Sequence, residues 1–238
     1  MGMTVAARRR LLLDLARRLA QPGTGSARVF LEDRTAVARW PDLTPTLAGI
    51  PWAVVGAVAT RAYMPERTTQ DLGILVAASD QEEVRARLQR AGFLPVQELA
   101  IGGASWRSPT GALVDVIESE AAWVPDALRT LGQDPQGLPV LDLPYLVPMK
   151  VQAGWAQDLA DAARMLGASS EVRHQETRDL FRRWLPDALG DLESLITLGR
   201  LEDGDLNGPK SYTEAEYEAV ALTKVFHTSQ GDEPCASV

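Results

Sequence analysis

The sequence predicts an α+β fold, in which a mixed β-sheet is packed with helices and followed by a helical C-terminal extension. Short apolar runs bounded by turn residues alternate with helical patterns up to about residue 166. From residue 171 to about residue 226 the pattern is helical. The chain has 238 residues, and a domain above ~150 residues buries most of the surface that its unfolded chain exposes.

Changes in composition along the chain divide it into four parts. We expect an N-terminal helical segment at 1–45, a core at 46–166, a helical C-terminal region at 167–226 and a flexible tail at 227–238. In the first part, residues 7–20 have the spacing of an amphipathic helix, with Leu11, Leu12, Leu15 and Leu19 in one stripe. This helix is either a basic arm for RNA or another phosphate-rich partner, or a solvated helix that covers a core, and we favour the second interpretation.

Composition and charge limit the classes of function. The net charge of -8 argues against broad nucleic-acid binding, although it leaves room for a local basic patch. The single cysteine, Cys235, excludes a disulfide framework and a cysteine zinc site. No apolar run reaches the ~20 residues that a membrane-spanning helix needs. The sequence therefore predicts a cytoplasmic protein with no membrane partner.

The stretch from Trp52 to Val76 has the most informative pattern. An apolar run ends at Gly56, a short helical pattern follows, and a second apolar run begins after Asp71. A helix that begins at a glycine turn presents free N–H groups to an anion. A nearby carboxylate can hold Mg²⁺, which prefers oxygen ligands and shares them with substrate phosphates. The pattern thus predicts a site for phosphate and metal.

A second carboxylate lies in a later apolar run. Strand patterns at 93–99, 104–107 and 112–117 are separated by turn signals, which indicates a meander. The third of these strands contains Asp115 between valines. A buried aspartate costs several kcal/mol unless a partner compensates for it. That partner is either a metal ion or, if Asp115 lies at a strand end or edge, backbone N–H groups.

A long helix is predicted from about Asp142 to Leu166, with Pro144 near its start. It carries Lys150, and Asp158 and Asp161 are three residues apart on one of its faces. From the helix pattern alone, Lys150 is expected to be a surface lysine that pairs with an acid on the next turn. The two aspartates fit a structural role better than metal ligation.

The motif in the core resembles that of the nucleotidyltransferase fold, the DNA polymerase beta superfamily. Its closest resemblance is to the bacterial branch of abortive-infection toxin-type nucleotidyltransferases. That branch has a strand, Gly-Gly or Gly-Ser, a helix and then Arg-x-Thr-x-Asp-h-Asp, where h is apolar. In this chain, Gly56-Ala57 stands where the branch has Gly-Gly or Gly-Ser. The later stretch Arg67-Thr68-Thr69-Gln70-Asp71 matches Arg-x-Thr-x-Asp. The resemblance covers roughly residues 50–166 and implies a nucleotidyltransferase-like mixed sheet.

The resemblance also implies an activity and a set of site residues. A nucleotidyltransferase transfers a nucleoside monophosphate from a nucleoside triphosphate to an acceptor hydroxyl, commonly with two metal ions about 4 Å apart. The resemblance implies Mg²⁺ as cofactor. It also implies a protein, an RNA or a small hydroxyl compound as acceptor. The sequence fixes neither the acceptor nor the oligomeric state. The implied catalytic and metal-binding residues are Asp71 and Asp115, and the implied nucleotide-binding residues are Gly56, Ala57, Arg67, Thr69 and Lys150.

One position departs from the family pattern. Gly73 stands where the family has its second aspartate, and alternate residues of a strand share a face. A ligand that would point the same way as Asp71 is therefore absent, which weakens the second metal. The chain is then either a divergent enzyme with a reduced carboxylate set or a catalytically inactive binding or regulatory module. A third interpretation is an α+β domain whose agreement with the motif is accidental.

Overall fold

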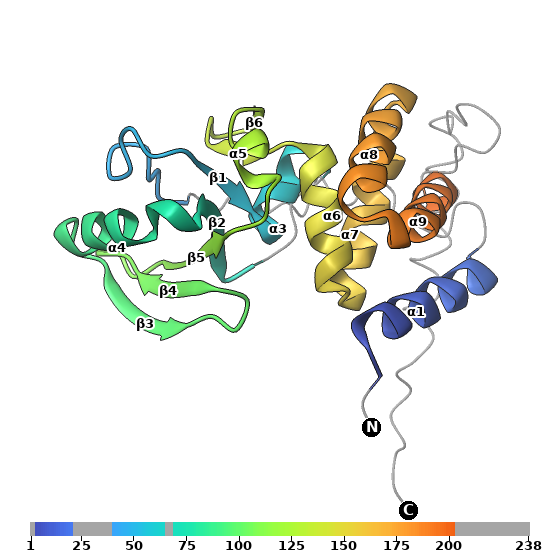
Figure 1. Ribbon diagram of the computed structural model, residues 1–238, viewed down its shortest axis with the longest axis horizontal. Coiled ribbons are helices and arrows are strands. Elements are labelled where there is room, and N and C mark those ends of the chain that lie inside the picture. The colour runs from blue at the N-terminus through green and yellow to red at the C-terminus, as the bar shows by residue number, and fades with distance from the viewer. Residues whose placement is uncertain (1–2, 21–39, 65–68, 203–238) are drawn as a thin grey trace, which may run out of the picture.

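The apolar runs of the core pair into one mixed sheet of seven strands, which confirms the predicted α+β class (Figure 1). The computed structural model of the chain describes residues 3–20, 40–64 and 69–202. The predicted helical pattern beyond residue 202 and the motif residue Arg67 lie outside these ranges. The strand order is β3-β4-β5-β2-β1-β7-β6. The strands are β1 (Trp52–Val55), β2 (Asp71–Ala77), β3 (Leu94–Glu98), β4 (Gly103–Arg107), β5 (Leu113–Ser119), β6 (Leu131–Gln133) and β7 (Pro139–Leu141).

The sheet is mixed because two kinds of connection join its strands. β1 is antiparallel to β2, and β3, β4 and β5 form the predicted antiparallel meander. β2 is parallel to β5, and β1 is parallel to β7. Parallel neighbours need a long crossover, and between β2 and β5 this crossover consists of α4 (Gln81–Arg90) and the β3–β4 hairpin. β2 thus lies at the centre, between β1 and β5.

Helices gather at one end of the molecule, while β2–β5 and α4 lie at the other (Figure 1). The longer helices of this end are α1 (Val5–Leu19), α6 (Leu143–Ala153), α7 (Ala156–Gly167), α8 (Glu171–Trp184) and α9 (Leu189–Glu202). The short ones of the chain are α3 (Gly56–Ala59), α5 (Val124–Ala127), η1 (Thr60–Ala62), η2 (Ala78–Asp80) and η3 (Pro186–Ala188). In the part of the chain that the structure describes, no helix has the length and apolar character needed to cross a membrane.

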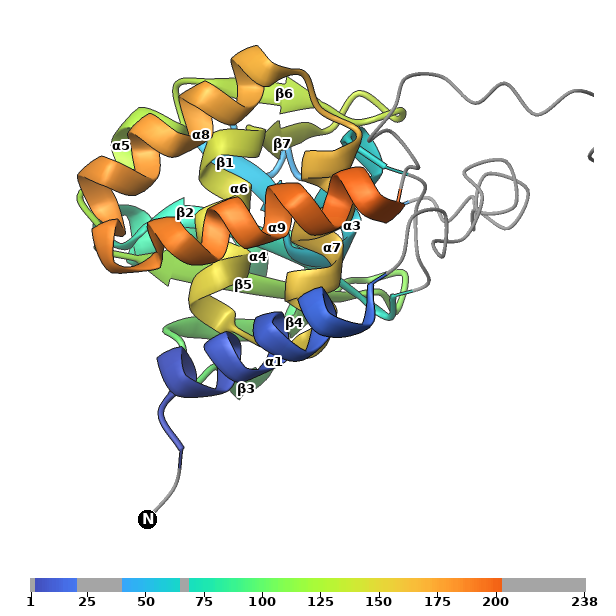
Figure 2. The same cartoon turned by 90° about the vertical axis from the view of Figure 1, so that its right-hand side faces the viewer.

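The N-terminal helix is confirmed, but its leucine stripe is not what it buries. α1 lies beside α9 (Figure 2), and its buried residues are Arg9 and Leu13. The Arg9 guanidinium pairs with Asp191 of α9 at 2.5 Å and also donates to the Val151 carbonyl. Leu11, Leu15 and Leu19 are exposed. The buried face of this helix is therefore formed by Arg9 and Leu13, and of the predicted leucine stripe Leu12 packs against the core.

The predicted long helix after Asp142 is two helices. Asp142 caps α6 as expected, since its carboxylate accepts a hydrogen bond from the Leu143 N–H at 2.9 Å. α6 ends at Gly154, which has a left-handed backbone, and α7 starts two residues later. The prediction of one continuous helix was wrong because this glycine turns the chain. As a result, Asp158 and Asp161 lie on a different helix from Lys150.

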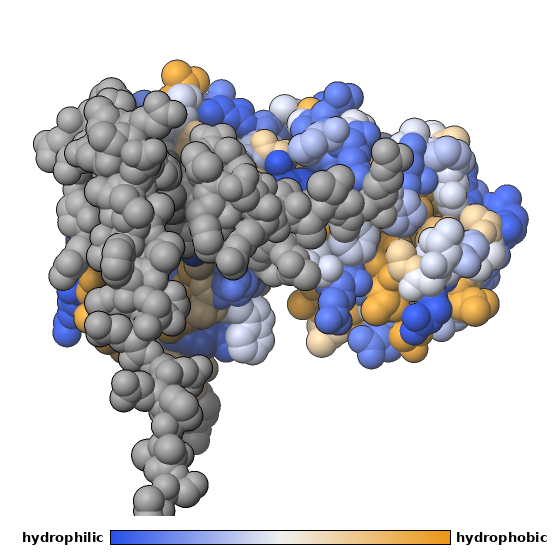
Figure 3. Space-filling view, turned by 180° about the vertical axis from the view of Figure 1, so that it is seen from behind, coloured by the Kyte–Doolittle hydropathy of each residue, from blue (hydrophilic) through white to orange (hydrophobic). Residues whose placement is uncertain are grey.

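The β3–β4 end of the sheet has apolar side chains on its surface. From behind, orange side chains gather at this end (Figure 3), and the exposed apolar residues there include Leu94, Val96 and Ile101. β3 is an edge strand, and an exposed edge is a template for pairing with another chain. Pro95 and a bulge between Pro95 and Gln97 interrupt this edge. The sequence of β3 thus limits edge-to-edge association.

Two glycines allow α7 and α9 to touch through their backbones. A Cβ on Gly167 would lie 2.5 Å from the Gly199 carbonyl oxygen, and a Cβ on Gly199 would overlap the Ala163 carbonyl oxygen. Real Cβ atoms do not approach backbone atoms this closely, so any side chain here would force the helices apart. The contact between α7 and α9 therefore requires glycine at both positions.

We expect Gly199→Ala to lower the free energy of unfolding by about 1–3 kcal/mol, because the added methyl group overpacks the α7–α9 contact. Gly190→Ala is the matched control on the same helix, since a Cβ there meets nothing within 4 Å. The control should leave stability unchanged or raise it by up to about 1 kcal/mol. Urea unfolding of both variants measures this, and equal stabilities would contradict the close approach.

Candidate functional site

Three predicted positions meet on one face of the sheet, where β1 ends and β2 begins. Asp71 and Gly73 are two residues apart on β2, so their side-chain positions share a face. Gly73 is the register partner of Asp115 on parallel β5 and of Val55 on antiparallel β1. Residues paired directly across neighbouring strands also share a face. Asp71 and Asp115 are therefore diagonal neighbours that flank the side chain missing at Gly73.

A hydroxyl group holds each of the two carboxylates. Thr69 Oγ1 donates to Asp71 Oδ1 at 3.0 Å, and Ser105 Oγ donates to Asp115 Oδ1 at 2.5 Å. Both aspartates are half-buried. Among the residues that the structure describes, neither forms an ion pair with a lysine or an arginine.

The glycine turn lies at the same edge of the sheet. β1 ends at Val55, and Gly56 follows with a φ of 71° as the first residue of α3. Few side chains tolerate this left-handed conformation, so the turn favours glycine. Ala57 continues α3, which leads into η1. The predicted phosphate turn is thus next to the strand that carries Asp71.

Tyr63, at the end of η1, connects this helical segment to β7. Its hydroxyl donates to the Leu141 carbonyl oxygen at 3.0 Å. Burial, assisted by the negative charge of Asp142, raises the pKa of Tyr63 well above its usual range. The phenol therefore stays neutral and keeps its donor. This contact joins the segment that follows the glycine turn to β7 and to the cap of α6.

Lys150 is engaged elsewhere in the fold. Its side chain is 3% exposed, and its ammonium group donates to Asp161 at 2.8 Å and to Asp158 at 3.1 Å. Gln157 also donates to Asp161 at 3.0 Å. These contacts tie α6 to α7, which agrees with the structural role expected for the two aspartates. A role of Lys150 toward phosphates stays a prediction, as does that of Arg67.

The donor set fits one divalent ion better than two. In the described residues, no group of three or more His, Cys, Asp or Glu side chains could hold a metal ion. Mg²⁺ is commonly held by one or two carboxylates together with substrate phosphates and water. Asp71 and Asp115 supply oxygen ligands of that kind from one face of the sheet. These residues therefore fit a magnesium ion that a bound nucleotide completes.

The structure adds residues that the sequence analysis missed. A row of register partners crosses the sheet on the carboxylate face through Gln97, Ser105, Asp115, Gly73 and Val55. Arg107 lies on the same face of β4, two residues from Ser105, and is exposed. The alternation of side chains along β4 could have predicted that Ser105 and Arg107 share a face. Only the pairing of β4 with β5 places them beside Asp115.

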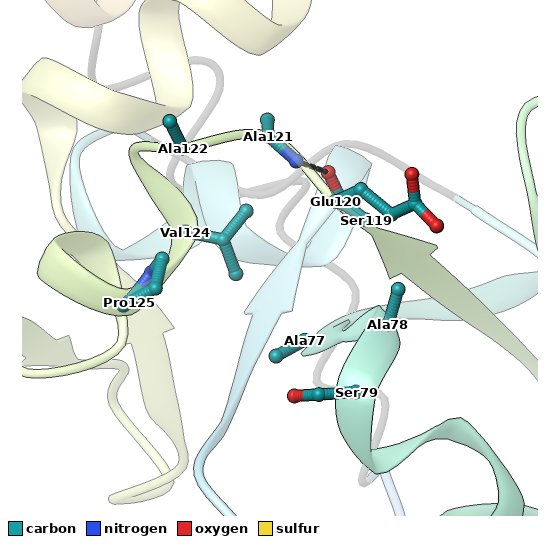
Figure 4. Close-up of a pocket in the computed structure, with 9 residues that line it drawn as sticks. All are labelled: Ala77, Ala78, Ser79, Ser119, Glu120, Ala121, Ala122, Val124 and Pro125. Atoms are coloured by element: carbon teal, nitrogen blue, oxygen red, sulfur yellow. Dashed lines mark hydrogen bonds between the residues drawn. The ribbon is translucent and has the colours of Figure 1, made fainter.

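A separate hollow of about 440 Å³ lies at the opposite edge, where β2 and β5 end (Figure 4). Small side chains from both strand ends line it, and Figure 4 shows the Ala121 N–H donating to the Ser119 hydroxyl at 3.3 Å. Glu120 is the one titratable group in its lining. Because Asp71 is at the amino end of β2, this hollow is not part of the carboxylate site.

No protein-family model and no curated protein matches the chain. Solved structures of nucleotidyltransferases resemble it at low TM-scores. The solution structure of the antibiotic-resistance factor ANT(2'')-Ia has a TM-score of 0.37 and 13% identity, covering 78% of this chain and 94% of that one. The crystal structure of ANT(2'')-Ia with adenylyl-2''-tobramycin has the same score and identity, covering 66% and 93%. A CCA-adding enzyme with CTP has a TM-score of 0.30 and 11% identity, covering 92% and 54%. Because these TM-scores are low, the similarity does not assign a function to this chain. A functional assignment therefore depends on the chain's own residues and strand order.

We expect Asp161→Asn to lower the free energy of unfolding by about 3 kcal/mol, because it removes one of the two acids that neutralise buried Lys150. Asp179→Asn is the control, since Asp179 pairs with Arg182 on an exposed helix surface. Breaking an exposed pair costs ~0–1 kcal/mol. Chemical denaturation compares the two variants, and similar losses would show that Lys150 does not depend on Asp161.

Proposed function

We propose that this chain is a divergent nucleotidyltransferase-fold protein that binds a nucleoside triphosphate together with Mg²⁺ at the face formed by Asp71 and Asp115. One observation supports this most strongly: the register of β2 and β5 puts both carboxylates on the same face, next to the Gly56 turn. The sequence motif and the strand pairing point to the same face of the sheet, which supports the proposal over an accidental match with the motif.

Each residue of the proposed site has a defined role. Asp71 and Asp115 hold the ion, and the Gly56-Ala57 turn offers backbone N–H groups to phosphate oxygens. Thr69 orients Asp71 through its hydrogen bond. Arg67 is the proposed phosphate-binding cation. Lys150 would take that role only by leaving Asp158 and Asp161, with which it pairs. When bound, the magnesium ion neutralises charge on the phosphates.

In the transfer we propose, the acceptor hydroxyl oxygen forms a bond to the α-phosphorus of the nucleotide. The bond from that phosphorus to the bridging oxygen breaks, pyrophosphate leaves, and the hydroxyl proton passes to water. The proposed acceptor is a protein or an RNA, and membership of the bacterial toxin-type branch is part of the same proposal. The acidic net charge of -8 favours an acceptor other than a long nucleic acid.

A second candidate function is a catalytically inactive binding or regulatory module. The observation in its favour is Gly73, which leaves the face with two carboxylates where the family has three. Such a module would still bind a nucleotide through the site residues that the chain retains. The two candidates differ in whether pyrophosphate is released, so nucleotide binding alone does not separate them.

We expect Asp71→Asn to raise the Kd for the magnesium complex of a nucleoside triphosphate by at least about 10-fold, because a neutral amide is a poor ligand for Mg²⁺. Isothermal titration calorimetry with each of the common nucleoside triphosphates, with and without magnesium, measures this. Asp80→Asn is the control, since Asp80 follows β2 at its other end. Magnesium-dependent binding that is unaffected by Asp71→Asn would refute the site.

We expect Gly73→Asp to increase both metal binding and transfer, because it restores the missing carboxylate. A Cβ at Gly73 would lie 3.3 Å from the Val55 carbonyl oxygen, so the strand needs only a small adjustment. Titration with Mn²⁺ in the presence of a non-hydrolysable triphosphate should show about one ion per chain in wild type and about two in the variant. Pyrophosphate release reports the transfer.

Gly73→Asn controls for side-chain volume at this position and should resemble wild type. A Gly73→Asp variant that folds but gains neither an ion nor pyrophosphate release would show that the site lacks more than one carboxylate. That outcome would favour the inactive module.

A further inference from the structure

A buried hydroxyl touches one of the two proposed metal ligands. Ser105 lies on β4 as the direct register partner of Asp115 and is 5% exposed. Its Oγ donates to Asp115 Oδ1 at 2.5 Å. The sequence motif does not include this residue, and the proposed function gives it no role.

The hydrogen bond constrains the carboxylate in a specific way. The terminal torsion of an aspartate side chain is broad and has no sharp rotamer of its own. An ionised carboxylate has two acceptor oxygens, and a donor fixed to one of them sets the orientation of the other. Because Ser105 comes from the neighbouring strand, the sheet itself holds the donor in place. Asp115 Oδ2 is thereby left for another partner.

We propose that Ser105 is a positioning residue that orients Asp115 for the divalent ion, an inference that rests on the proposed function. Thr69 has the equivalent relation to Asp71, so each ligand on this face has one hydroxyl donor. With Gly73 in the middle, only two protein carboxylates contribute to binding. A site with fewer ligands depends more on the orientation of each, because disorder in either one costs binding free energy.

Two substitutions at this position separate orientation from packing. Ser105→Ala removes only the oxygen atom and leaves a small residue in a buried strand. Ser105→Thr keeps the hydroxyl, and its β-branched side chain suits a strand. Ser108→Ala is a matched control, because Ser108 is also buried at 5% and its hydroxyl accepts from the Ala112 N–H at 3.0 Å, in the turn after β4.

The test is a Mn²⁺ titration of the full chain followed by electron paramagnetic resonance, in the presence of a non-hydrolysable triphosphate. Ser105→Ala should weaken Mn²⁺ binding by about 10- to 100-fold, the usual effect of removing a residue that holds a metal ligand. Ser105→Thr should restore binding close to that of wild type. Ser108→Ala should leave Mn²⁺ affinity unchanged even if it lowers the unfolding midpoint.

Three results would overturn the inference, and they are distinguishable. If wild type binds Mn²⁺ and Ser105→Ala binds it equally well, Ser105 only fills space and the proposed function is unaffected. If wild type binds no Mn²⁺ with or without the triphosphate, the proposed function itself fails and the role of Ser105 fails with it. Equal weakening in Ser105→Ala and Ser108→Ala would also contradict a specific effect on Asp115.

Discussion

The register of β2 between β1 and β5 is the constraint on which the candidate site depends. It places Gly73 between Val55 and Asp115 and brings Asp71 to the same face. A slip of one residue would move Asp115 to the opposite face. The other face enforces the register, because Ile74 and Val116 are fully buried there and a slip would expose them. Burial of apolar side chains thus fixes the register that brings the two carboxylates to one face.

The fully buried charges and the two half-buried carboxylates of the candidate site have different kinds of partner. Buried charges elsewhere are matched, as in the pairs of Arg61 with Asp134 and of Lys150 with Asp161. Such pairs avoid the high cost of an isolated buried charge. Asp71 and Asp115 receive hydroxyl donors instead, and within the described residues no arginine or lysine forms an ion pair with them.

Local patterns predicted much of the fold correctly, and their failures have physical causes. The meander of β3, β4 and β5 follows from alternation and turn residues, which act over a few positions. The leucine stripe of α1 failed as a guide because Arg9 finds Asp191 on a distant helix. The long helix failed because Gly154 ends α6, which in turn allowed Lys150 to meet Asp161 on α7. In both cases a residue far along the chain, Asp191 or Asp161, neutralises a buried cation that the local pattern left without a partner.

The sequence by itself determined the α+β class, the glycine turn after β1 and the alternation that gives Asp71 and position 73 a common face, because these depend on neighbouring residues alone. The tertiary structure decided that β5 lies beside β2, and that β4 brings Ser105 to Asp115. Strand order is settled by packing among segments far apart in the chain, and no local period specifies it. The carboxylate pair and its supporting hydroxyl groups exist only once that packing is complete.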